Sequence, residues 1–230
     1  MTTTVEPQTV RVEQKSTRPL SRKVEIDRRP TLDFTKRVID VVGSVVALVL
    51  LSPIILISAI LVALSSAGPI FFRQRRVGAG GEEFTCLKFR TMVCDAEDLK
   101  HDLATQSHHA DPRTFKMKRD PRITKFGYWL RRSSADELPQ LFNVLRGDMS
   151  LVGPRPPVPS EVAIYSDGDM NRLAVKPGLT CIWQVSGRAD IPFDQQVAMD
   201  VRYIEQRSLW LDLKLMVLTL PALLSGKGAY

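Results

Sequence analysis

The chain has 230 residues, of which 44% are hydrophobic and 25% are charged, a globular composition that excludes wholesale disorder, a collagen-like repeat and a bundle of many transmembrane helices. The 32 lysines and arginines outnumber the 25 aspartates and glutamates, which favours anionic partners such as phospholipid headgroups or phosphorylated small molecules. Aromatic residues make up only 7% of the chain, which disfavours single-stranded nucleic acid, and we expect no nucleic-acid partner.

A polar arm, residues 1–33, opens the chain. It contains three prolines and shows no helical periodicity of apolar residues, so we expect it to be mobile and to carry no chemistry. Residues 34–67 follow, and they include an uncharged run from Val41 to Ala67. This run lies too deep in the chain to be a signal peptide. We therefore predict that residues 34–67 insert into a membrane.

Two topologies are open for this apolar segment. A straight helix from Val41 to Ala67 would be roughly 40 Å long, enough to cross a hydrocarbon core of roughly 30 Å. However, Ser52-Pro53 lies at its midpoint, where proline removes a backbone donor and kinks the helix into two arms too short to cross alone. Both flanks are rich in lysine and arginine, which favours keeping both on the cytoplasmic side. We predict a re-entrant helix in which Ser52 bonds a backbone group freed at the kink; a single-pass helix that tolerates the proline is the alternative.

Two short strands are predicted after the apolar segment. Residues 70–77 and 84–90 flank the glycine-rich turn 78–81, which is typical of a β-hairpin. Lys88 and Arg90 lie in the second strand, either as solvated strand charges or as phosphate contacts. Residues 95–118 have no clear period and predict a surface helix or loop, and the histidines there do not match the spacing of a zinc site.

The densest stretch of polar side chains runs from residue 120 to residue 147. A short helix is predicted to begin near Ser134 to Asp136 and to end at Gly147, with Ser134 and Glu137 as a capping box. Asp136 is then either an N-cap or a nucleophile, and Glu137 either a charge that matches the helix dipole or a metal ligand. Arg131 lies one to two turns away and could neutralise a phosphate.

Three longer motifs resemble one family. Lys88–Met92, Asp136–Pro156 and Lys176–Arg188 are similar to the bacterial sugar transferases, the polyisoprenyl-phosphate hexose-1-phosphate transferases, also called monotopic phosphoglycosyl transferases. The resemblance covers about residues 34 to 224 and is to the short type that primes exopolysaccharide synthesis. It implies a mainly α fold with a small β-hairpin (α+β), a re-entrant helix broken at a Ser-Pro pair like Ser52-Pro53, and a cytosolic catalytic domain, residues 68–230, with interfacial helices.

The resemblance also implies a reaction. Members of the family transfer hexose 1-phosphate from a UDP-sugar, here UDP-galactose or UDP-glucose, to undecaprenyl phosphate, and they release UMP at the cytoplasmic face of the bacterial inner membrane. Asp136 matches the nucleophile that forms a covalent phosphosugar ester, and Glu137 matches the residue that binds Mg²⁺. Membrane lipid and downstream glycosyltransferases are the expected partners, and a homodimer is left open. A membrane-tethered scaffold without turnover, or a phosphatase-like enzyme, is the rival hypothesis.

Further positions match family residues with roles in substrate binding. Arg131 and Arg155 match phosphate-binding arginines, and Lys88 with Arg90 belongs to the Lys-Phe-Arg motif. Other matches are two residues of a motif that helps to hold the nucleotide and two acidic residues regarded as functionally important: Gln184, Arg188, Asp200 and Asp212. Structural hydrogen bonding is the open alternative for Gln184, Arg188 and Asp200.

Two helices are predicted near the C-terminus. Residues 194–207 place Val197, Val201 and Ile204 on one face. Residues 209–224 are apolar but interrupted by charges and a proline, so they are poorly suited to span a membrane. Burial against the core and interfacial docking with Trp210 at headgroup depth are both open for this helix.

Overall fold

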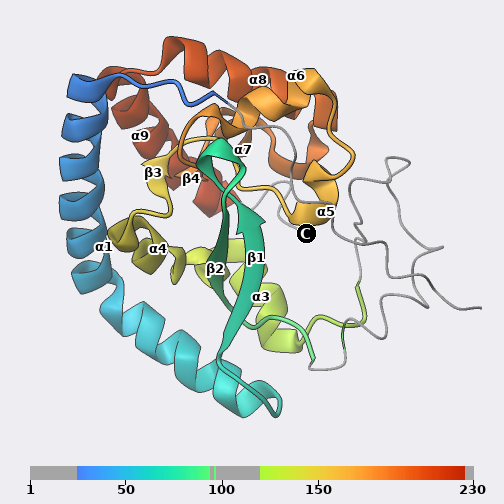
Figure 1. The fold of residues 1–230 in the computed structure, drawn as a ribbon. Coiled ribbons are helices and arrows are strands. Elements are labelled where there is room, and N and C mark those ends of the chain that lie inside the picture. Colours follow the sequence, from blue (N-terminus) through green and yellow to red (C-terminus); the bar gives the residue numbers. More distant parts are fainter. Residues whose placement is uncertain (1–24, 94–95, 97–119, 226–230) are drawn as a thin grey trace, which may run out of the picture.

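The computed structural model describes residues 25–93, 96 and 120–225. Most of these residues are helical, and the strands form two small sheets, β1 with β2 and β3 with β4. The long first helix, α1 (Pro30–Ser65), frames one side of the molecule, and the other elements pack within the bend of α1 (Figure 1). The structure thus has the predicted mixture of helices with little sheet. Residues 95–118, except Ala96, lie outside the described residues.

Helix α1 begins earlier than the sequence suggests. The helix starts at Pro30, and the Asp33 carboxylate accepts a hydrogen bond from the Arg29 N–H at 2.9 Å. Residues 25–29 also pack against the body, since Arg207 forms ion pairs with Asp27 at 3.1 Å and with Asp33 at 2.7 Å. The predicted mobile arm therefore extends no further than residue 24, and residues 1–24 lie outside the described residues.

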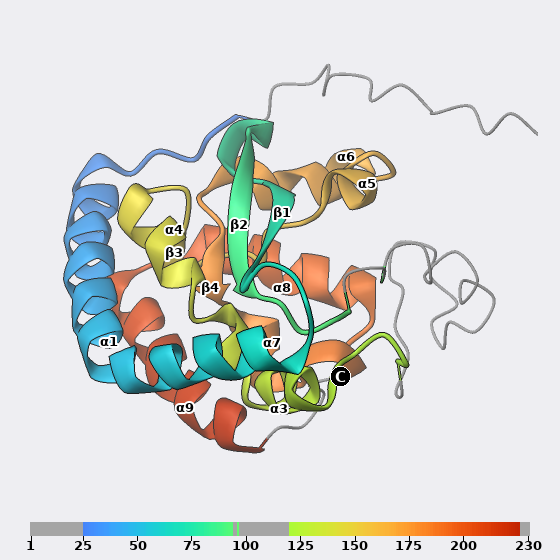
Figure 2. The ribbon, with the colours of Figure 1, turned by 90° about the horizontal axis from the view of Figure 1, so that it is seen from below.

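Pro53 lies inside α1, and the helix changes direction along its course (Figures 1 and 2). A proline has no N–H to donate to the carbonyl four residues earlier, which here belongs to Val49. The Ser52 hydroxyl donates to this Val49 carbonyl oxygen at 2.8 Å. The side chain before the proline thus satisfies the acceptor that the proline leaves open. No membrane is present in the structure, so the re-entrant topology itself stays a prediction.

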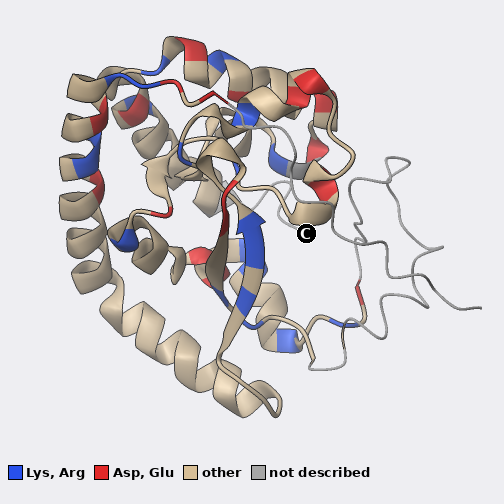
Figure 3. Cartoon of the chain, in the orientation of Figure 1, with Lys and Arg blue, Asp and Glu red and all other residues tan. Residues whose placement is uncertain are grey.

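Charge and apolar surface are separated along α1. Its charged residues all lie in the first third of the helix, and the remainder carries none (Figure 3). Apolar side chains on this remainder are exposed, with Leu64 79% exposed as the extreme case. The helix is long and apolar enough to cross a membrane by length and composition. An exposed apolar surface of this extent marks contact with a membrane or another protein.

The predicted β-hairpin is confirmed. Strand β1 (Phe71–Val77) pairs antiparallel with β2 (Glu83–Phe89) around the 3₁₀ turn η1 (Ala79–Gly81). Gly80 has a φ of 68° in this turn, a conformation that favours glycine. Phe71 and Phe89 stack at a ring-centroid distance of 5.5 Å at the far end of the hairpin.

A second, parallel strand pair was not predicted. Strand β3 (Ser150–Val152) pairs with β4 (Gly178–Thr180), and each strand has only three residues. The backbones touch beyond the ladder, because a Cβ on Gly178 would lie 2.0 Å from the Gly153 nitrogen. Only glycine permits this approach.

Short helices connect the sheets, and two longer helices complete the body. The elements not yet named are α3 (Lys125–Ser133), α4 (Gln140–Arg146), α5 (Pro159–Val162), α6 (Asp167–Met170), α7 (Ile182–Ser186), α8 (Phe193–Gln206) and α9 (Leu209–Ser225), with the 3₁₀ turns η3 (Ala135–Glu137), η4 (Asn171–Ala174) and η5 (Arg188–Asp190). As predicted, Val197 and Ile204 of α8 are buried on one face.

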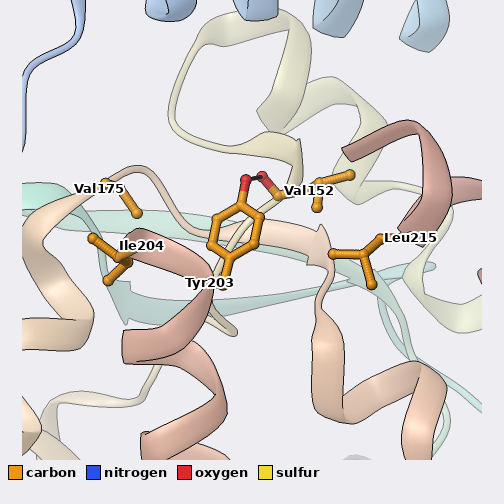
Figure 4. Packing of buried hydrophobic residues seen from close by; sticks show 5 residues of the cluster. All are labelled: Val152, Val175, Tyr203, Ile204 and Leu215. Carbon is orange, nitrogen blue, oxygen red and sulfur yellow. Dashed lines mark hydrogen bonds between the residues drawn. The ribbon is translucent and has the colours of Figure 1, made fainter. Parts of the chain in front are cut away.

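The main core cluster lies where β3, α8 and α9 meet (Figure 4). It contains Val152, Val175, Tyr203, Ile204 and Leu215. Leu215 buries one side of α9, whereas Trp210 at the start of the same helix is 75% exposed. Helix α9 therefore packs on the core with one side and leaves apolar side chains uncovered on another.

We expect Gly178→Ala to destabilise the fold, because the added methyl group meets the Gly153 backbone and neither strand can shift without breaking the β3–β4 ladder. The expected cost is about 2 to 4 kcal/mol of unfolding free energy, measurable as a lower thermal midpoint in detergent. Gly168→Ala is the matched control, since the nearest atom to its new Cβ is a serine hydroxyl 3.8 Å away. Equal midpoints for the two variants would contradict the close approach.

Candidate active site

Asp136 and Glu137 lie in the single 3₁₀ turn η3, between α3 and α4. Helix α3 ends at Ser134, whose φ of 56° and ψ of 18° are left-handed. This conformation is uncommon for a residue with a Cβ, and such strained residues cluster at functional sites. The reversal at Ser134 directs the following turn into the body, and Asp136 is buried.

The predicted start of a helix at Ser134 to Asp136 is wrong, and so is the capping box. The Ser134 side chain makes no capping hydrogen bond, and α4 begins only at Gln140. Pro139 accounts for the delay, because it has no N–H to donate to the Ala135 carbonyl and its ring disfavours a continuous α-helix from Ser134. The Leu138 N–H bonds the Ala135 carbonyl at 3.2 Å instead, which closes the tighter 3₁₀ turn. Asp136 is thus not an N-cap.

A shallow hollow, open to solvent, lies between η3, the hairpin and the β3–β4 pair. Its charged and amide-bearing lining consists of Arg76, Lys88, Glu137, Gln140, Arg155 and Gln184. Three cationic side chains thus face one carboxylate on its wall. An excess of positive charge in a concave site favours an anionic ligand such as a phosphate or diphosphate.

Lys88 and Glu137 form an ion pair within this hollow. The Lys88 ammonium lies 2.5 Å from Glu137 Oε1, and both side chains are partly buried. Burial acts to raise the pKa of the Glu137 carboxyl, but the charge and hydrogen bond of Lys88 and the charges of two arginines lower it below its ordinary value. Glu137 is therefore ionised at neutral pH and available to a cation.

Asp136 has a different environment from its neighbour. Burial raises the pKa of the Asp136 carboxyl to about 6, against the opposing charge of Lys88. The adjacent Glu137 charge raises this pKa further, and Arg131 lowers it. Two neighbouring carboxyls with pKa values shifted in opposite directions are typical of sites that divide chemical labour between them. At neutral pH the Asp136 carboxylate is mostly ionised and poorly solvated, which suits a nucleophile.

Arg131 approaches this dyad from the last turn of α3. Its Nε donates to the Thr91 hydroxyl at 2.9 Å, which fixes the side chain beside the turn. Burial lowers the pKa of the Arg131 guanidinium, and the charge of Asp136 partly restores it. Arg131 therefore lies close enough to interact electrostatically with Asp136, as the motif position suggested.

Arg155 and Gln184 line the hollow, whereas Arg188 lies outside its lining. The Arg155 guanidinium is 3.6 Å from Glu161 and also lines the hollow. Gln184 Oε1 and Arg188 Nη1 are buried and have no hydrogen-bond partner among the described residues. Arg188 also has a left-handed φ of 53°, and its charge interacts with that of Glu137. Unsatisfied buried polar atoms and a strained backbone in the segment from Gln184 to Arg188 are typical of a functional site.

Arg90 lies outside the lining of the hollow. Although Arg90 is two residues from Lys88, its guanidinium donates to the Val62 and Ser66 carbonyls at 3.2 and 2.6 Å, at the end of α1. It is only 7% exposed and does not line the hollow. The Arg90 cation thus satisfies carbonyl acceptors that the end of α1 leaves open, and a contact of Arg90 with substrate stays a prediction.

Asp200 and Asp212 also lie outside the hollow. Asp200 is fully buried and accepts two hydrogen bonds from Arg172, at 2.6 and 2.9 Å, which join α8 to η4. Asp212 pairs with Lys36 of α1 at 2.6 Å and accepts from the Tyr203 hydroxyl at 2.8 Å. Both aspartates therefore hold elements together, which matches the structural alternative for Asp200, while Asp200 Oδ1 has no hydrogen-bond partner among the described residues; that the two aspartates contact substrate stays a prediction.

Sequence reasoning missed Arg76. This arginine is buried in the lining of the hollow, where it donates to the Pro156 carbonyl at 2.7 Å and to the Gln74 side chain at 2.6 Å. Burial and the nearby Arg155 lower the pKa of Arg76 to about 10. In the hairpin register Gln74 lies opposite Cys86, and Arg76 lies opposite Phe84. Side chains two residues apart in a strand share a face, so Arg76 lies on the same face of the hairpin as Lys88. This alternation could have identified Arg76 from the sequence.

Asp136 and Glu137 can serve as part of a divalent-metal site. Among the described residues, no group of three or more histidine, cysteine, aspartate or glutamate side chains is placed to hold a metal unaided. Mg²⁺ rarely needs such a group, because it is commonly held by one or two carboxylates together with water and substrate phosphates. An ionised Glu137 beside a hollow suited to phosphate fits this mode of binding.

We expect Asp136→Asn to stabilise the protein at neutral pH. The folded state holds the proton of Asp136 up to about pH 6, whereas the unfolded chain releases it near 3.8, so stability falls as the pH rises between these values. The amide removes this penalty, and we expect a gain of about 1 to 3 kcal/mol at pH 7 that vanishes below pH 4. Thermal midpoints measured across this pH range, with exposed Glu205→Gln as control, test this; a gain that persists at pH 3.5 would contradict it.

Comparison with known proteins identifies the family of this chain. The sequence profile of the family described as "Bacterial sugar transferase" matches residues 31–226. The exopolysaccharide production protein ExoY of Rhizobium meliloti is 40% identical over 205 residues, which cover 88% of this chain and 91% of ExoY.

Two longer relatives are also similar. The galactosyl transferase CpsE of Streptococcus agalactiae is 45% identical over 197 residues, 85% of this chain and 43% of CpsE. The UDP-glucose:undecaprenyl-phosphate glucose-1-phosphate transferase of Xanthomonas campestris is 43% identical over 213 residues, 89% of this chain and 42% of that enzyme. This chain thus spans less than half the length of these two relatives and most of ExoY. The chain belongs to the bacterial sugar transferase family.

Proposed function

We propose that this protein transfers hexose 1-phosphate from a UDP-hexose to undecaprenyl phosphate and releases UMP. Relatives named for undecaprenyl-phosphate galactose and glucose transfer support the reaction class, and their two sugars make UDP-galactose or UDP-glucose the proposed donor. The observation that carries the proposal is a buried, ionisable Asp136 that interacts electrostatically with Lys88 and directly precedes Glu137, two residues that line a hollow with an excess of cationic side chains; Asp136 itself lies behind this lining. The exopolysaccharide role of ExoY, as its name states it, supports a place at the first membrane step of polysaccharide synthesis.

The proposed reaction has two balanced steps. An Asp136 carboxylate oxygen attacks the phosphorus that carries the sugar, the bond from that phosphorus to the UMP oxygen breaks, and UMP leaves as the anion. An undecaprenyl phosphate oxygen then attacks the same phosphorus, and the Asp136 carboxylate is released. The covalent ester allows donor and acceptor to use one hollow in turn.

The cationic side chains of the hollow have distinct tasks in this proposal. Lys88 and Arg155 neutralise the phosphate oxygens as charge develops on them, which is the main source of rate in phosphoryl transfer. Gln184 and Arg188, whose polar atoms lack partners, hold the nucleotide. Glu137 is the proposed ligand of Mg²⁺, which when bound supplies further neutralisation of the diphosphate.

A release assay tests the proposal. We expect the full-length protein in detergent or membranes to release more than one equivalent of UMP from a suitable UDP-sugar only when undecaprenyl phosphate and Mg²⁺ are present; without the lipid, release should stop at about one equivalent per protein, and EDTA should stop it altogether. Asp136→Asn is expected to be inactive because an amide cannot form the ester, and the wild-type rate is expected to fall as the pH drops through about 6. Absence of UMP under all conditions would support a scaffold without turnover, and equal release without the lipid would support hydrolysis.

We also propose that α1 is re-entrant and that the body lies at the cytoplasmic face. Both ends of α1 contact the same body: Lys36 bonds Asp212 near the start, and Arg90 bonds Ser66 after the end. A helix that crossed the bilayer completely would carry one of these ends to the opposite side. The uncharged middle of α1 then enters the membrane and returns.

Cysteine accessibility in intact cells tests this topology. In a Cys94→Ser background, we expect Val10→Cys and Arg75→Cys to resist a membrane-impermeant thiol reagent until the membrane is opened, because both positions then lie on the cytoplasmic side. Arg75 reports the side on which the body lies, since its side chain is 80% exposed and a cysteine there can be labelled. Cys86 and Cys181 are buried and should remain silent. Labelling of Val10→Cys alone in intact cells would establish a single-pass helix.

A further inference from the structure

Two charged residues of α1 hold strand β3. Asp40 Oδ1 accepts hydrogen bonds from the Ser150 hydroxyl at 3.0 Å and from the Leu151 N–H at 2.9 Å. One turn earlier on the same helix face, Lys36 donates to the Val152 carbonyl at 2.8 Å. Each residue of β3 is therefore bonded by a side chain from the first third of α1.

Strand β3 continues directly into the wall of the hollow. The Gly153 N–H bonds the Thr180 carbonyl at 3.0 Å, and the Pro154 carbonyl accepts from the Gly178 N–H at 2.8 Å. The next residue, Arg155, lines the hollow. Because the contact between Gly153 and Gly178 leaves no space, the segment from β3 to Pro154 cannot shift independently of β4.

Among the described residues, the hydrogen bonds of the Asp40 carboxylate go to β3, and its charge also interacts with those of Lys36 and Asp212. It is 4% exposed, so it does not face a lipid headgroup, and it does not line the hollow, so it does not touch substrate there. Burying a carboxylate costs desolvation free energy, and hydrogen bonds to its oxygens offset this cost. Both hydrogen bonds to Asp40 Oδ1 come from β3, the strand that leads to Arg155.

We propose that Asp40 is a positioning residue: by fixing β3 from the anchor helix, it sets the place of Arg155 in the hollow. The inference rests on the proposed function, because the effect is read out through the reaction in which Arg155 neutralises phosphate. It links the start of the membrane segment to the site by two hydrogen bonds and five residues of backbone, Ser150 to Pro154.

Three substitutions in the full-length protein test the contact. We expect Asp40→Ala to lower kcat/KM for UMP release about tenfold, the order of effect of losing a buried acceptor for two donors. Asp40→Asn keeps the Oδ1 acceptor and is expected to retain activity within about threefold. Asp33→Ala is the control, since Asp33 lies on the same helix and pairs with Arg207 rather than with β3; it is expected to leave the rate nearly unchanged.

A double-mutant cycle with Arg155→Ala separates positioning from general destabilisation. If Asp40 acts through Arg155, Asp40→Ala should cost less than about twofold in an Arg155→Ala background, although it costs about tenfold alone. The same cycle on the dissociation constant for UMP provides a second readout where residual turnover is small. Equal costs in both backgrounds, or no cost of Asp40→Ala in wild type, would overturn the inference.

A milder variant covers the case in which Asp40→Ala does not fold. Ser150→Ala removes one of the two hydrogen bonds to Asp40 and leaves its charge and the Leu151 bond in place. We expect the same non-additivity with Arg155→Ala at a smaller scale, and full additivity would again refute the proposal. A wild-type protein that releases no UMP would refute the proposed function instead, so the two failures are distinguishable.

Discussion

The structure depends on the polar first third of α1, which fastens an otherwise apolar helix to the body. Lys36 pairs with Asp212 of α9, and Arg37 donates to the Val144 and Leu145 carbonyls at the end of α4. Charges so placed are largely shielded from solvent, and their partners would be costly to leave unpaired. The same contacts place the start of the membrane segment and the candidate site on one rigid frame.

The candidate site uses charge imbalance rather than a preformed metal cage. Asp136 and Glu137 are adjacent in sequence, yet burial raises the pKa of the first and the nearby Lys88 helps to lower that of the second. The left-handed Ser134 directly precedes the turn that carries Asp136 and Glu137, and the left-handed Arg188 lies four residues after Gln184, which lines the hollow, so both strained residues flank segments of the proposed site. A bound diphosphate would match the surplus of positive charge.

How much the sequence predicts differs between elements. The hairpin and the buried face of α8 follow from periodicity, and both are confirmed. The β3–β4 pair was missed because three-residue strands carry no periodic signal, and the helix start failed because of Pro139. Motif similarity identified Lys88, Arg131 and Arg155 as candidate site residues. It could not reveal that Asp200 pairs with Arg172 and that Asp212 pairs with Lys36. Such partners become visible only when the fold brings them together.

Arg29, Arg37 and Arg90 share one arrangement: each donates to the carbonyls at the end of a helix to which it does not itself belong. The three helix ends are those of α8, α4 and α1. A helix capped by its own next residues can fray alone, but a helix capped from another element frays only when that element also moves away. The anchor and the body should therefore melt as one cooperative unit, with no stable half remaining after the other is lost.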